Sequence, residues 1–342
     1  MGQISVLTER HGIAYRPITC HHQVVPAPPP MSDLGRNAPA LMSWFDGFRR
    51  DLPWRNPSKS SDHRIDASLN PPVDPWGILV SEIMLQQTPV ARVEPIWRAW
   101  MQRWPTPADL AAATPAEVIR AWGKLGYPRR ALRLHAAANA LVERHDGRVP
   151  DDLDALLALP GIGDYTAGAI LAFAFQRPAL ALDTNVRRVL ARHDGGRAYP
   201  AASITAAERA RASELMATSG DGAQWMAALM ELGALICTSA SPHCEKCPVA
   251  EGCRWRALGY PDDAPRPRRQ PRYDGSDRQA RGALLDVLRA ADGPVSKKRL
   301  DLAWADMSQR ERALDSLVAD GLVEAMPRGR FTLPTTPMAS ET

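Results

Sequence analysis

The spacing of apolar residues is helical almost throughout residues 44–257. Trp97, Trp100 and Trp104 stand at positions i, i+3 and i+7, which places their side chains on one face of a helix. Such a face is buried against neighbouring elements, so we expect the three tryptophans to belong to a core. The pattern predicts a mainly α-helical protein whose largest domain spans residues 36–257.

Three segments break the helical pattern. Residues 1–35 have no helical or strand period and include the run PAPPP, which predicts a disordered tail; Met31 is an alternative start of the chain. Residues 56–72 are rich in Ser, Pro and Asp and are expected to form a surface loop. Residues 258–277 contain a Pro- and Arg-rich stretch, typical of an extended linker that can also contact phosphates.

The C-terminal part, residues 278–334, has a different order of elements. Three helical segments are followed by a hairpin made of Val323–Met326, a Pro-Arg-Gly-Arg turn and Phe331–Leu333. Three helices and a two-stranded wing indicate a winged-helix-like module, with residues 335–342 as a tail. Because such modules bind DNA in some proteins and dock other proteins elsewhere, a protein partner for this module stays open.

The charge and length of the chain limit its class. Its 342 residues allow more than one domain, and 42 Lys and Arg against 38 Asp and Glu give a net charge of +4, which suits a polyanionic partner. The sequence contains no apolar run of about 18 residues, and no basic region followed by an apolar core at its start. We therefore expect no membrane contact, and a cytoplasmic protein that is associated with the nucleoid if the source is bacterial.

Four of the five cysteines fall within 17 residues: Cys237, Cys244, Cys247 and Cys253. A secreted disulfide framework would spread them, so this spacing indicates metal ligands. Zinc sites usually show two C-x2-C pairs, and here only one is present. One 4Fe-4S cluster is therefore favoured over zinc, either as a redox centre or as a structural staple for a basic loop.

A second motif is the segment Leu159–Thr166, which contains Gly161 and Gly163. A helix over residues 152–158 leads into the Gly-x-Gly turn, and a second helix follows. The core side of the first helix is predicted to consist of Leu153, Leu156 and Leu157. Two glycines allow positive φ and close backbone approach, and the free N–H groups of the second helix can bind a DNA phosphate. We interpret the segment as a helix-hairpin-helix signature; a plain helix connection is the alternative.

Two carboxylates stand out by their surroundings. Glu82 has Ile78, Leu79 and Leu85 as helical neighbours, so desolvation should keep its carboxyl protonated and able to act as an acid. Asp183 precedes a helical segment, where it can cap the helix and also stabilise a cationic sugar. Cleavage of a glycosidic bond needs this pair, one acid and one carboxylate. A Glu82 side chain that simply reaches an arginine is the alternative.

Together these motifs resemble the helix-hairpin-helix DNA glycosylases with an iron-sulfur loop, and more narrowly the MutY-type adenine DNA glycosylases. The resemblance spans residues 42–256 and rests on the segments Leu52–Arg55, Ser81–Thr88, Gly123–Tyr127, Leu159–Gly168, Leu182–Val186, Met230–Ala234 and the cysteine spacing. It implies a two-lobed helical fold, a 4Fe-4S loop over residues 237–253, and hydrolysis of adenine from double-stranded DNA in which it is mispaired with 8-oxoguanine or guanine. We expect a monomer.

The resemblance also assigns roles to residues. It implies that Glu82 protonates the flipped adenine, that Asp183 stabilises the sugar cation with help from Asn185, and that Tyr165 supports Asp183. The adenine pocket is expected to be lined by Arg50, Trp54, Arg55, Glu231 and Asn185. Contacts to DNA are expected from Gln87 and Tyr127, which wedge into the base stack, from Thr88 and Leu125, which face the opposite guanine, and from the hairpin glycines Gly161 and Gly163.

Two features separate this chain from its relatives. Endonuclease III-like enzymes have a lysine where this chain has Tyr165, so a Schiff base and strand cleavage are not expected. No Nudix-like pattern follows Pro261, and the winged-helix-like segment stands in its place. An endonuclease III-like or thymine-mismatch glycosylase, and a DNA-binding iron-sulfur protein without catalysis, remain the alternatives.

Overall fold

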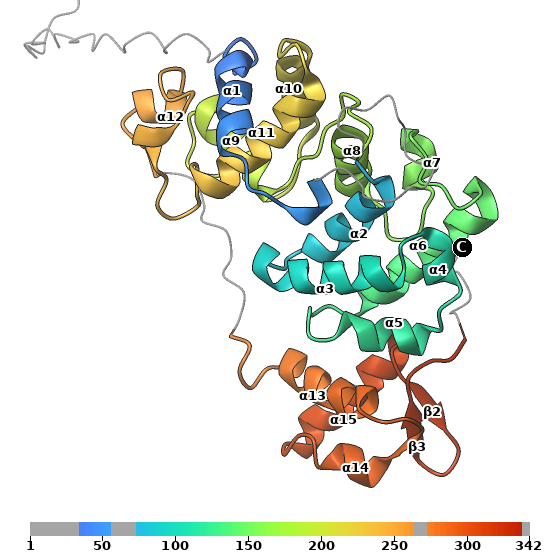
Figure 1. The fold of residues 1–342 in the computed structure, drawn as a ribbon. Helices are drawn as coiled ribbons and strands as arrows, with labels where there is room; N and C mark the ends of the chain where they lie inside the picture. Colours follow the sequence, from blue (N-terminus) through green and yellow to red (C-terminus); the bar gives the residue numbers. More distant parts are fainter. Residues whose placement is uncertain (1–33, 56–72, 263–271, 337–342) are drawn as a thin grey trace, which may run out of the picture. The chain divides into compact units, whose positions relative to one another are not determined.

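The structure is a computed structural model that describes residues 34–55, 73–262 and 272–336, and these are mainly helical (Figure 1). The expected loop at 56–72 and most of the expected N-terminal tail lie outside the described residues. Contacts divide the chain into Met1–Pro30 and Met31–Thr342, so everything described below belongs to the second unit. Within the described ranges, none of the helices combines the length and apolar character that crossing a membrane requires.

A first core lies among helices from the first half of the chain. It contains Trp100 and Trp104, with Trp97 packed against it, as the tryptophan spacing predicted. Thr106 with Asp109, and Thr114 with Glu117, form capping boxes that fix where two of the helices begin. The elements around this core are η1 (Pro53–Arg55), α2 (Pro75–Leu85), α3 (Val90–Arg103), α4 (Pro107–Ala111), α5 (Pro115–Trp122), α6 (Arg129–His145) and α7 (Leu153–Leu157).

A second core joins the N-terminal helix to the helices that follow residue 180. Helix α1 packs against α11, and α11 packs against α9 (Figure 1). Leu34 is fully buried in this core, so the expected tail over residues 1–35 ends earlier than the sequence indicated. The elements of this lobe are α1 (Ala38–Phe48), α9 (Thr184–His193), α10 (Ala206–Ala217), α11 (Gly222–Leu235), η2 (Cys244–Lys246) and α12 (Arg254–Ala257).

Helix α8 (Asp164–Phe173) belongs to both cores. Ala167 and Ile170 face the first core, whereas Ala169 and Ala172 face the second. Gly168 is needed because a Cβ there would lie 2.0 Å from the carbonyl oxygen of Leu180. The helix is therefore the shared wall of a two-lobed fold, in agreement with the fold class predicted from the sequence.

The hairpin before α8 departs from expectation at two positions. Gly161 has φ +76°, and a Cβ there would lie 2.8 Å from the Cβ of Arg133, so this turn requires glycine. Gly163 is the N-cap of α8, with φ −112° and open space around it. Neither positive φ nor close packing therefore requires glycine at this position. Leu153 is 46% exposed, which corrects its assignment to the core, while Leu156 is fully buried.

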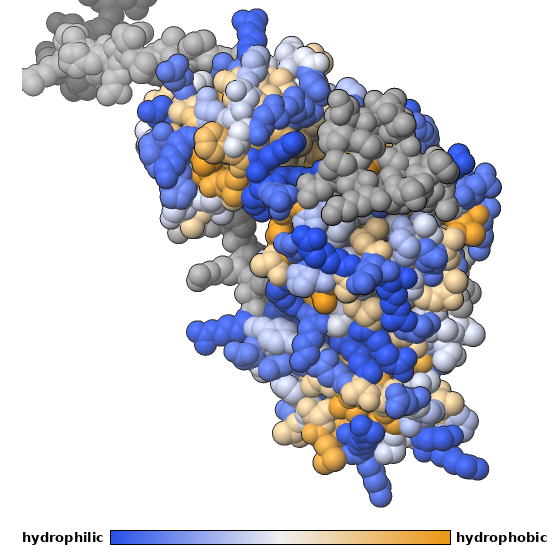
Figure 2. Space-filling model, in the orientation of Figure 1, coloured by the Kyte–Doolittle hydropathy of each residue, from blue (hydrophilic) through white to orange (hydrophobic). Residues whose placement is uncertain are grey.

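The C-terminal module, residues 272–336, contains three helices and a three-stranded sheet. The sheet has one strand more than the sequence predicted, because Val295 also pairs with Phe331, in the strand order β1-β3-β2. Figure 2 shows apolar residues at the surface of this part of the chain beside hydrophilic ones. The elements are α13 (Asp277–Arg289), β1 (Val295–Ser296), α14 (Lys297–Asp301), α15 (Met307–Ala319), β2 (Glu324–Met326) and β3 (Arg330–Thr332).

The C-terminal module is packed against α5. Ala116 and Ile119 of α5 belong to the same apolar cluster as the leucines of α13 and α15. Polar contacts continue the interface: Arg120 donates to the carbonyl of Ala291 over 3.1 Å, and Arg289 donates to the carbonyl of Ile119 over 3.2 Å. Apolar packing and hydrogen bonds together thus hold α13 at this face of the first lobe.

Candidate active site

Glu82 lies inside the first lobe on α2 and is only 4% exposed. Its carboxyl accepts a hydrogen bond from Tyr165, whose hydroxyl donates to Oε2 over 2.8 Å. Burial, the largest influence, raises the pKa of Glu82 from 4.5 to about 7, with the charge of Asp183 adding to the rise and Tyr165 and Arg55 opposing it. The carboxyl can therefore carry a proton near neutral pH, as its apolar neighbours indicated.

Asp183 is the N-cap of α9 in the second lobe. It accepts hydrogen bonds from the backbone N–H of Val186 and from Nδ2 of Asn185, each over 2.7 Å. Burial raises the pKa of Asp183, while these hydrogen bonds and the charge of Arg188 oppose the rise. Helix capping and a preorganised carboxylate are thus combined in one residue.

Tyr165 interacts electrostatically with both carboxyls, those of Glu82 and Asp183. Burial and the charges of both Glu82 and Asp183 raise the pKa of the Tyr165 hydroxyl well above its usual value, so it stays protonated and donates. The expectation that Tyr165 supports Asp183 is corrected here, because its hydroxyl bonds to Glu82 instead. The side chain leaves α8, the wall shared by the two lobes, and so reaches the carboxyl on α2.

An arginine clamp holds a second buried glutamate, Glu231 on α11. Arg50 donates to its carboxylate from Nε over 2.8 Å and from Nη2 over 2.9 Å, and Arg55 donates from Nη2 over 2.9 Å. Burial opposes ionisation, but the hydrogen bonds and charges of the two arginines outweigh it and lower the pKa of Glu231 to about 2. The clamp joins three of the predicted pocket residues, and Arg55 also lies close enough to Glu82 to influence its pKa.

Trp54, another predicted pocket residue, is only 4% exposed. Its indole packs edge-on against Trp97 with ring centroids 5.8 Å apart. It therefore contributes packing to the first core rather than an open surface.

The residues expected to wedge into DNA lie on two adjacent turns. Gln87 and Tyr127 are exposed, and both have positive φ, +56° and +47°. Backbone conformations of this kind are rare for such residues and cluster at functional sites. Thr88 and Leu125 are buried instead, 6% and 3% exposed, so their side chains do not lie at the surface where contact with a guanine was expected.

Arg130 holds these two turns together, and sequence reasoning missed it. Its Nη1 donates to the carbonyls of Ile83 and Met84, and its Nη2 donates to the carbonyl of Gly126 and to Thr88 Oγ1. The sequence around Arg130 does not mark it as a structural residue, because its partners lie in other segments, at the end of α2 and in the turns after α2 and α5. A buried arginine thus ties both turns of the wedge into one unit.

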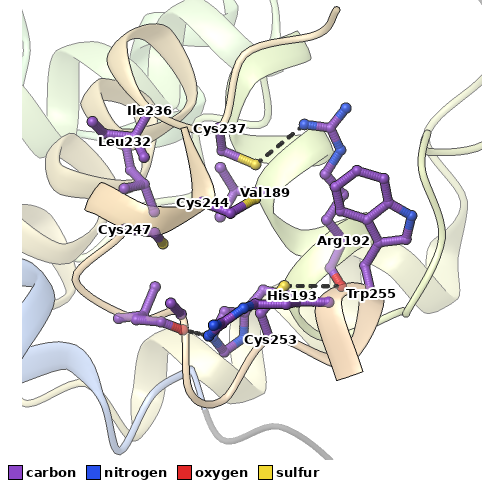
Figure 3. A pocket seen from close by; sticks show the side chains of 13 residues that line it. Val189, Arg192, His193, Leu232, Ile236, Cys237, Cys244, Cys247, Cys253 and Trp255 are labelled. Atoms are coloured by element: carbon purple, nitrogen blue, oxygen red, sulfur yellow. Dashed lines mark hydrogen bonds between the residues drawn. The ribbon is translucent and has the colours of Figure 1, made fainter. Parts of the chain in front are cut away.

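The four cysteines line one cavity together with apolar side chains from α9 and α11 (Figure 3). Burial raises the pKa of Cys247 to about 12, so an unliganded thiol there stays protonated and a positive metal centre would be needed to hold a thiolate. Among the described residues no three metal-ligating side chains converge as a single ion requires. Four cysteines that are separated along the chain nevertheless line one cavity, as ligands of a shared metal centre must.

Two arginines of α9 contact the cysteine loop, and one of them, Arg188, also reaches Asn185 beside Asp183; no sequence motif marks either arginine. Arg192 approaches Cys237 Sγ to 3.5 Å and lies over the ring of Trp255 (Figure 3). Arg188 donates to the carbonyl of Cys237 over 2.7 Å and to Oδ1 of Asn185 over 2.9 Å, which orients the Asn185 amide toward Asp183. The cysteine loop and the N-cap of α9 therefore share a hydrogen-bond network.

Comparison with known proteins agrees with these motifs. Residues 80–214 match the HhH-GPD superfamily of base excision DNA repair proteins. Adenine DNA glycosylase of Mycolicibacterium smegmatis is 52% identical over 294 residues, which cover 86% of this chain and 94% of the relative. Adenine DNA glycosylase of Mycobacterium tuberculosis is 49% identical over 295 residues, 86% of this chain and 92% of the relative.

Solved structures agree on the fold. A thermostable thymine-DNA glycosylase is similar with a TM-score of 0.54 and 28% identity, over 65% of this chain and 95% of its own. An endonuclease III trapped on DNA has a TM-score of 0.52 and 23% identity, over 65% of this chain and 94% of its own. The resemblance stated from the motifs is confirmed: the chain belongs to the HhH-GPD superfamily of base excision DNA repair proteins, and within it to the adenine DNA glycosylase family.

Proposed function

We propose that the protein removes adenine that is mispaired with 8-oxoguanine or guanine in double-stranded DNA, and that it hydrolyses the N-glycosidic bond without cutting the strand. The observation that carries the proposal is the buried, protonatable Glu82 bonded to Tyr165 beside Asp183. The names of the most similar curated relatives support adenine as the base. Flipping a mispaired base out of the helix also costs less free energy than flipping a correctly paired base.

In this mechanism the two carboxyls have different tasks. Glu82 donates its proton to N7 of the flipped adenine, the C1′–N9 bond breaks with its electron pair leaving on the base, and the Glu82 carboxylate then takes a proton from the attacking water. Asp183 stabilises the positive charge that develops on the sugar, with Asn185 holding its orientation. Tyr165 offers a hydroxyl and no amine, so no covalent Schiff base forms.

The remaining residues bind the substrate in this proposal. Arg50, Arg55 and Glu231 form a rigid polar side of the adenine pocket, with Trp54 beneath them and Asn185 on the side of Asp183. Gln87 and Tyr127 enter the base stack, supported by Thr88 and Leu125 underneath. The turn at Gly161 and Gly163 presents the N–H groups at the start of α8 to a phosphate.

Cys237, Cys244, Cys247 and Cys253 would hold one 4Fe-4S cluster, which would fix the loop over residues 237–253. Arg188 and Arg192 then serve as the link between that loop and α9. The glycosylase domain would end near residue 257, with residues 258–277 as a linker and residues 278–334 as a winged-helix-like module. We propose a monomer that works in the cytoplasm, at the nucleoid of a bacterial cell.

The test is an excision assay with duplexes that present every base opposite adenine, together with duplexes that carry thymine mismatches and oxidised pyrimidines. Adenine release from the A:8-oxoguanine and A:G duplexes, with no covalent adduct after borohydride treatment, is the expected result. Release of thymine, or of an oxidised pyrimidine with a trapped adduct, would contradict the proposal and favour the thymine-mismatch or endonuclease III-like alternative. Tight duplex binding with no base released would favour a protein without catalysis.

A further inference from the structure

A groove of about 1060 Å³ separates the wedge region from the C-terminal module. One wall is the segment from Gly123 to Arg133, which includes Tyr127, and the other wall is α13 with Tyr273 just before it. This volume lies at the upper end of the range for small-molecule pockets, and the groove is open to solvent. It is therefore shaped for a chain-like ligand rather than for one enclosed molecule.

The groove is strongly basic. Its lining includes eight arginine and lysine side chains but only two acidic ones, Asp286 and Asp320. Each acid is already shared by two cations: Asp286 contacts Lys124 and Arg289, and Asp320 contacts Arg129 and Arg281. The remaining positive charge can attract an anion along the whole groove.

Some of these cations have no acidic neighbour among the described residues. Arg133 is exposed, and no described carboxylate lies within 4.0 Å of its guanidinium; the same holds for Arg92 at the start of α3. Lys124 is 85% exposed, and its contact with Asp286 is long, 3.5 Å. Figure 2 shows hydrophilic residues where α13 and the segment after α5 meet the surface. Such a row of solvated cations is suited to phosphates.

The groove is continuous with the wedge. Gln87 and Tyr127, the exposed residues proposed to enter the base stack, line it together with Tyr273, a residue that is 55% exposed. The two walls are also fixed to each other, because α13 shares an apolar cluster with α5 and Arg289 bonds to the carbonyl of Ile119. A strand that leaves the wedge therefore meets a preformed basic channel.

We propose that this groove binds the sugar–phosphate backbone of DNA next to the flipped base, so that α13 of the C-terminal module and the wedge segment hold one strand between them. The proposal rests on the proposed insertion of Gln87 and Tyr127 into DNA. It assigns the module's DNA contact to α13, in contrast to the wing or recognition helix that winged-helix proteins generally use.

The test measures duplex affinity by fluorescence anisotropy over a series of salt concentrations, using full-length protein and an A:8-oxoguanine duplex. Arg278→Ala on α13 and Lys124→Ala on the opposite wall are each expected to weaken binding roughly fivefold at about 0.15 M salt and to lower the salt slope by about 1. Arg299→Ala on α14 is the matched control, since Arg299 is exposed and outside the groove, and it should bind as the wild type does. Thermal melting checks that every variant is folded.

The outcomes separate this proposal from the proposed function. If the wild type releases adenine while Arg278→Ala and Lys124→Ala bind with its affinity and salt slope, the groove proposal alone fails. If Arg328→Ala in the wing weakens binding and the groove variants do not, the module uses the conventional winged-helix surface and the groove proposal is wrong. If the wild type neither binds the duplex nor releases adenine, both proposals fail.

Discussion

Two buried glutamates in this protein have pKa values that are shifted in opposite directions. Glu82 on α2 and Glu231 on α11 are 4% and 0% exposed, so loss of water acts against both anions. The pKa of Glu82 accordingly rises to about 7, whereas the pKa of Glu231 falls to about 2 despite its burial. The difference comes from their partners: Glu82 has one neutral hydroxyl donor, whereas Glu231 has two guanidinium groups.

This contrast shows how one helical scaffold supplies both an acid and an anchor. Burial alone gives a carboxyl that keeps its proton and can donate it, which is what a leaving base requires. Burial with paired arginines gives a fixed anion that can hold the guanidinium groups of a binding pocket in place. The same residue type therefore has two functions, and the tertiary neighbours select between them.

The largest expected effect is the loss of chemistry in Glu82→Gln. Glutamine keeps the shape of the side chain but cannot donate a proton in this way, so single-turnover adenine release from an A:8-oxoguanine duplex should fall by about 10²- to 10⁴-fold. Duplex affinity, measured by anisotropy, should change little. Unchanged single-turnover rates would remove Glu82 from the acid role.

Glu231→Gln tests the other half of the contrast. It leaves the partly exposed guanidinium groups of Arg50 and Arg55 without their anion, so the free energy of unfolding should fall by about 1.5 to 3 kcal/mol. Denaturant titration measures this change. The matched control is Glu94→Gln, which breaks the exposed pair with Arg98 and should cost at most about 1 kcal/mol. Equal losses in the two variants would mean that the clamp does not stabilise the fold.

The raised pKa of Glu82 should make the stability of the protein depend on pH. Its pKa is higher in the folded state than its ordinary 4.5, so the folded state is favoured below pH 4.5, and this advantage is lost as pH rises through about 7. The difference corresponds to about 3 kcal/mol. Glu82→Gln removes it, so the variant should be more stable than the wild type at pH 8, and the gap should close toward pH 4. If the difference in Tm between the variant and the wild type is the same at every pH in this range, the raised pKa is contradicted.

The smallest expected effect belongs to Tyr165→Phe. Its hydroxyl stabilises the Glu82 carboxylate and so lowers the pKa of that group, which means that phenylalanine should raise the pKa further. The alkaline limb of the single-turnover pH profile should move to higher pH, by about 1 pH unit for one neutral hydrogen bond. A lower rate with an unmoved limb would indicate that Tyr165 acts on the sugar or on Asp183 instead.

Much of the fold and part of the site could be predicted from local sequence signals. Helical spacing marked the tryptophan face, the cysteine spacing marked residues that line one cavity, and the apolar neighbours of Glu82 predicted its raised pKa. Asp183 was visible as a helix cap because an N-cap depends only on residues next to it in the chain. Each of these signals acts within a few residues, so no knowledge of packing was needed.

The contacts between distant segments were decided by the tertiary structure alone. Tyr165 donates to Glu82 rather than to Asp183, Arg130 ties two turns together, and the extra strand β1 pairs with β3. Leu153 is exposed and Leu34 is buried, against the local pattern. Hydrogen bonds and charges depend on which groups meet in space, and here the partners lie tens of residues apart, so only packing of the two lobes and the C-terminal module could determine them.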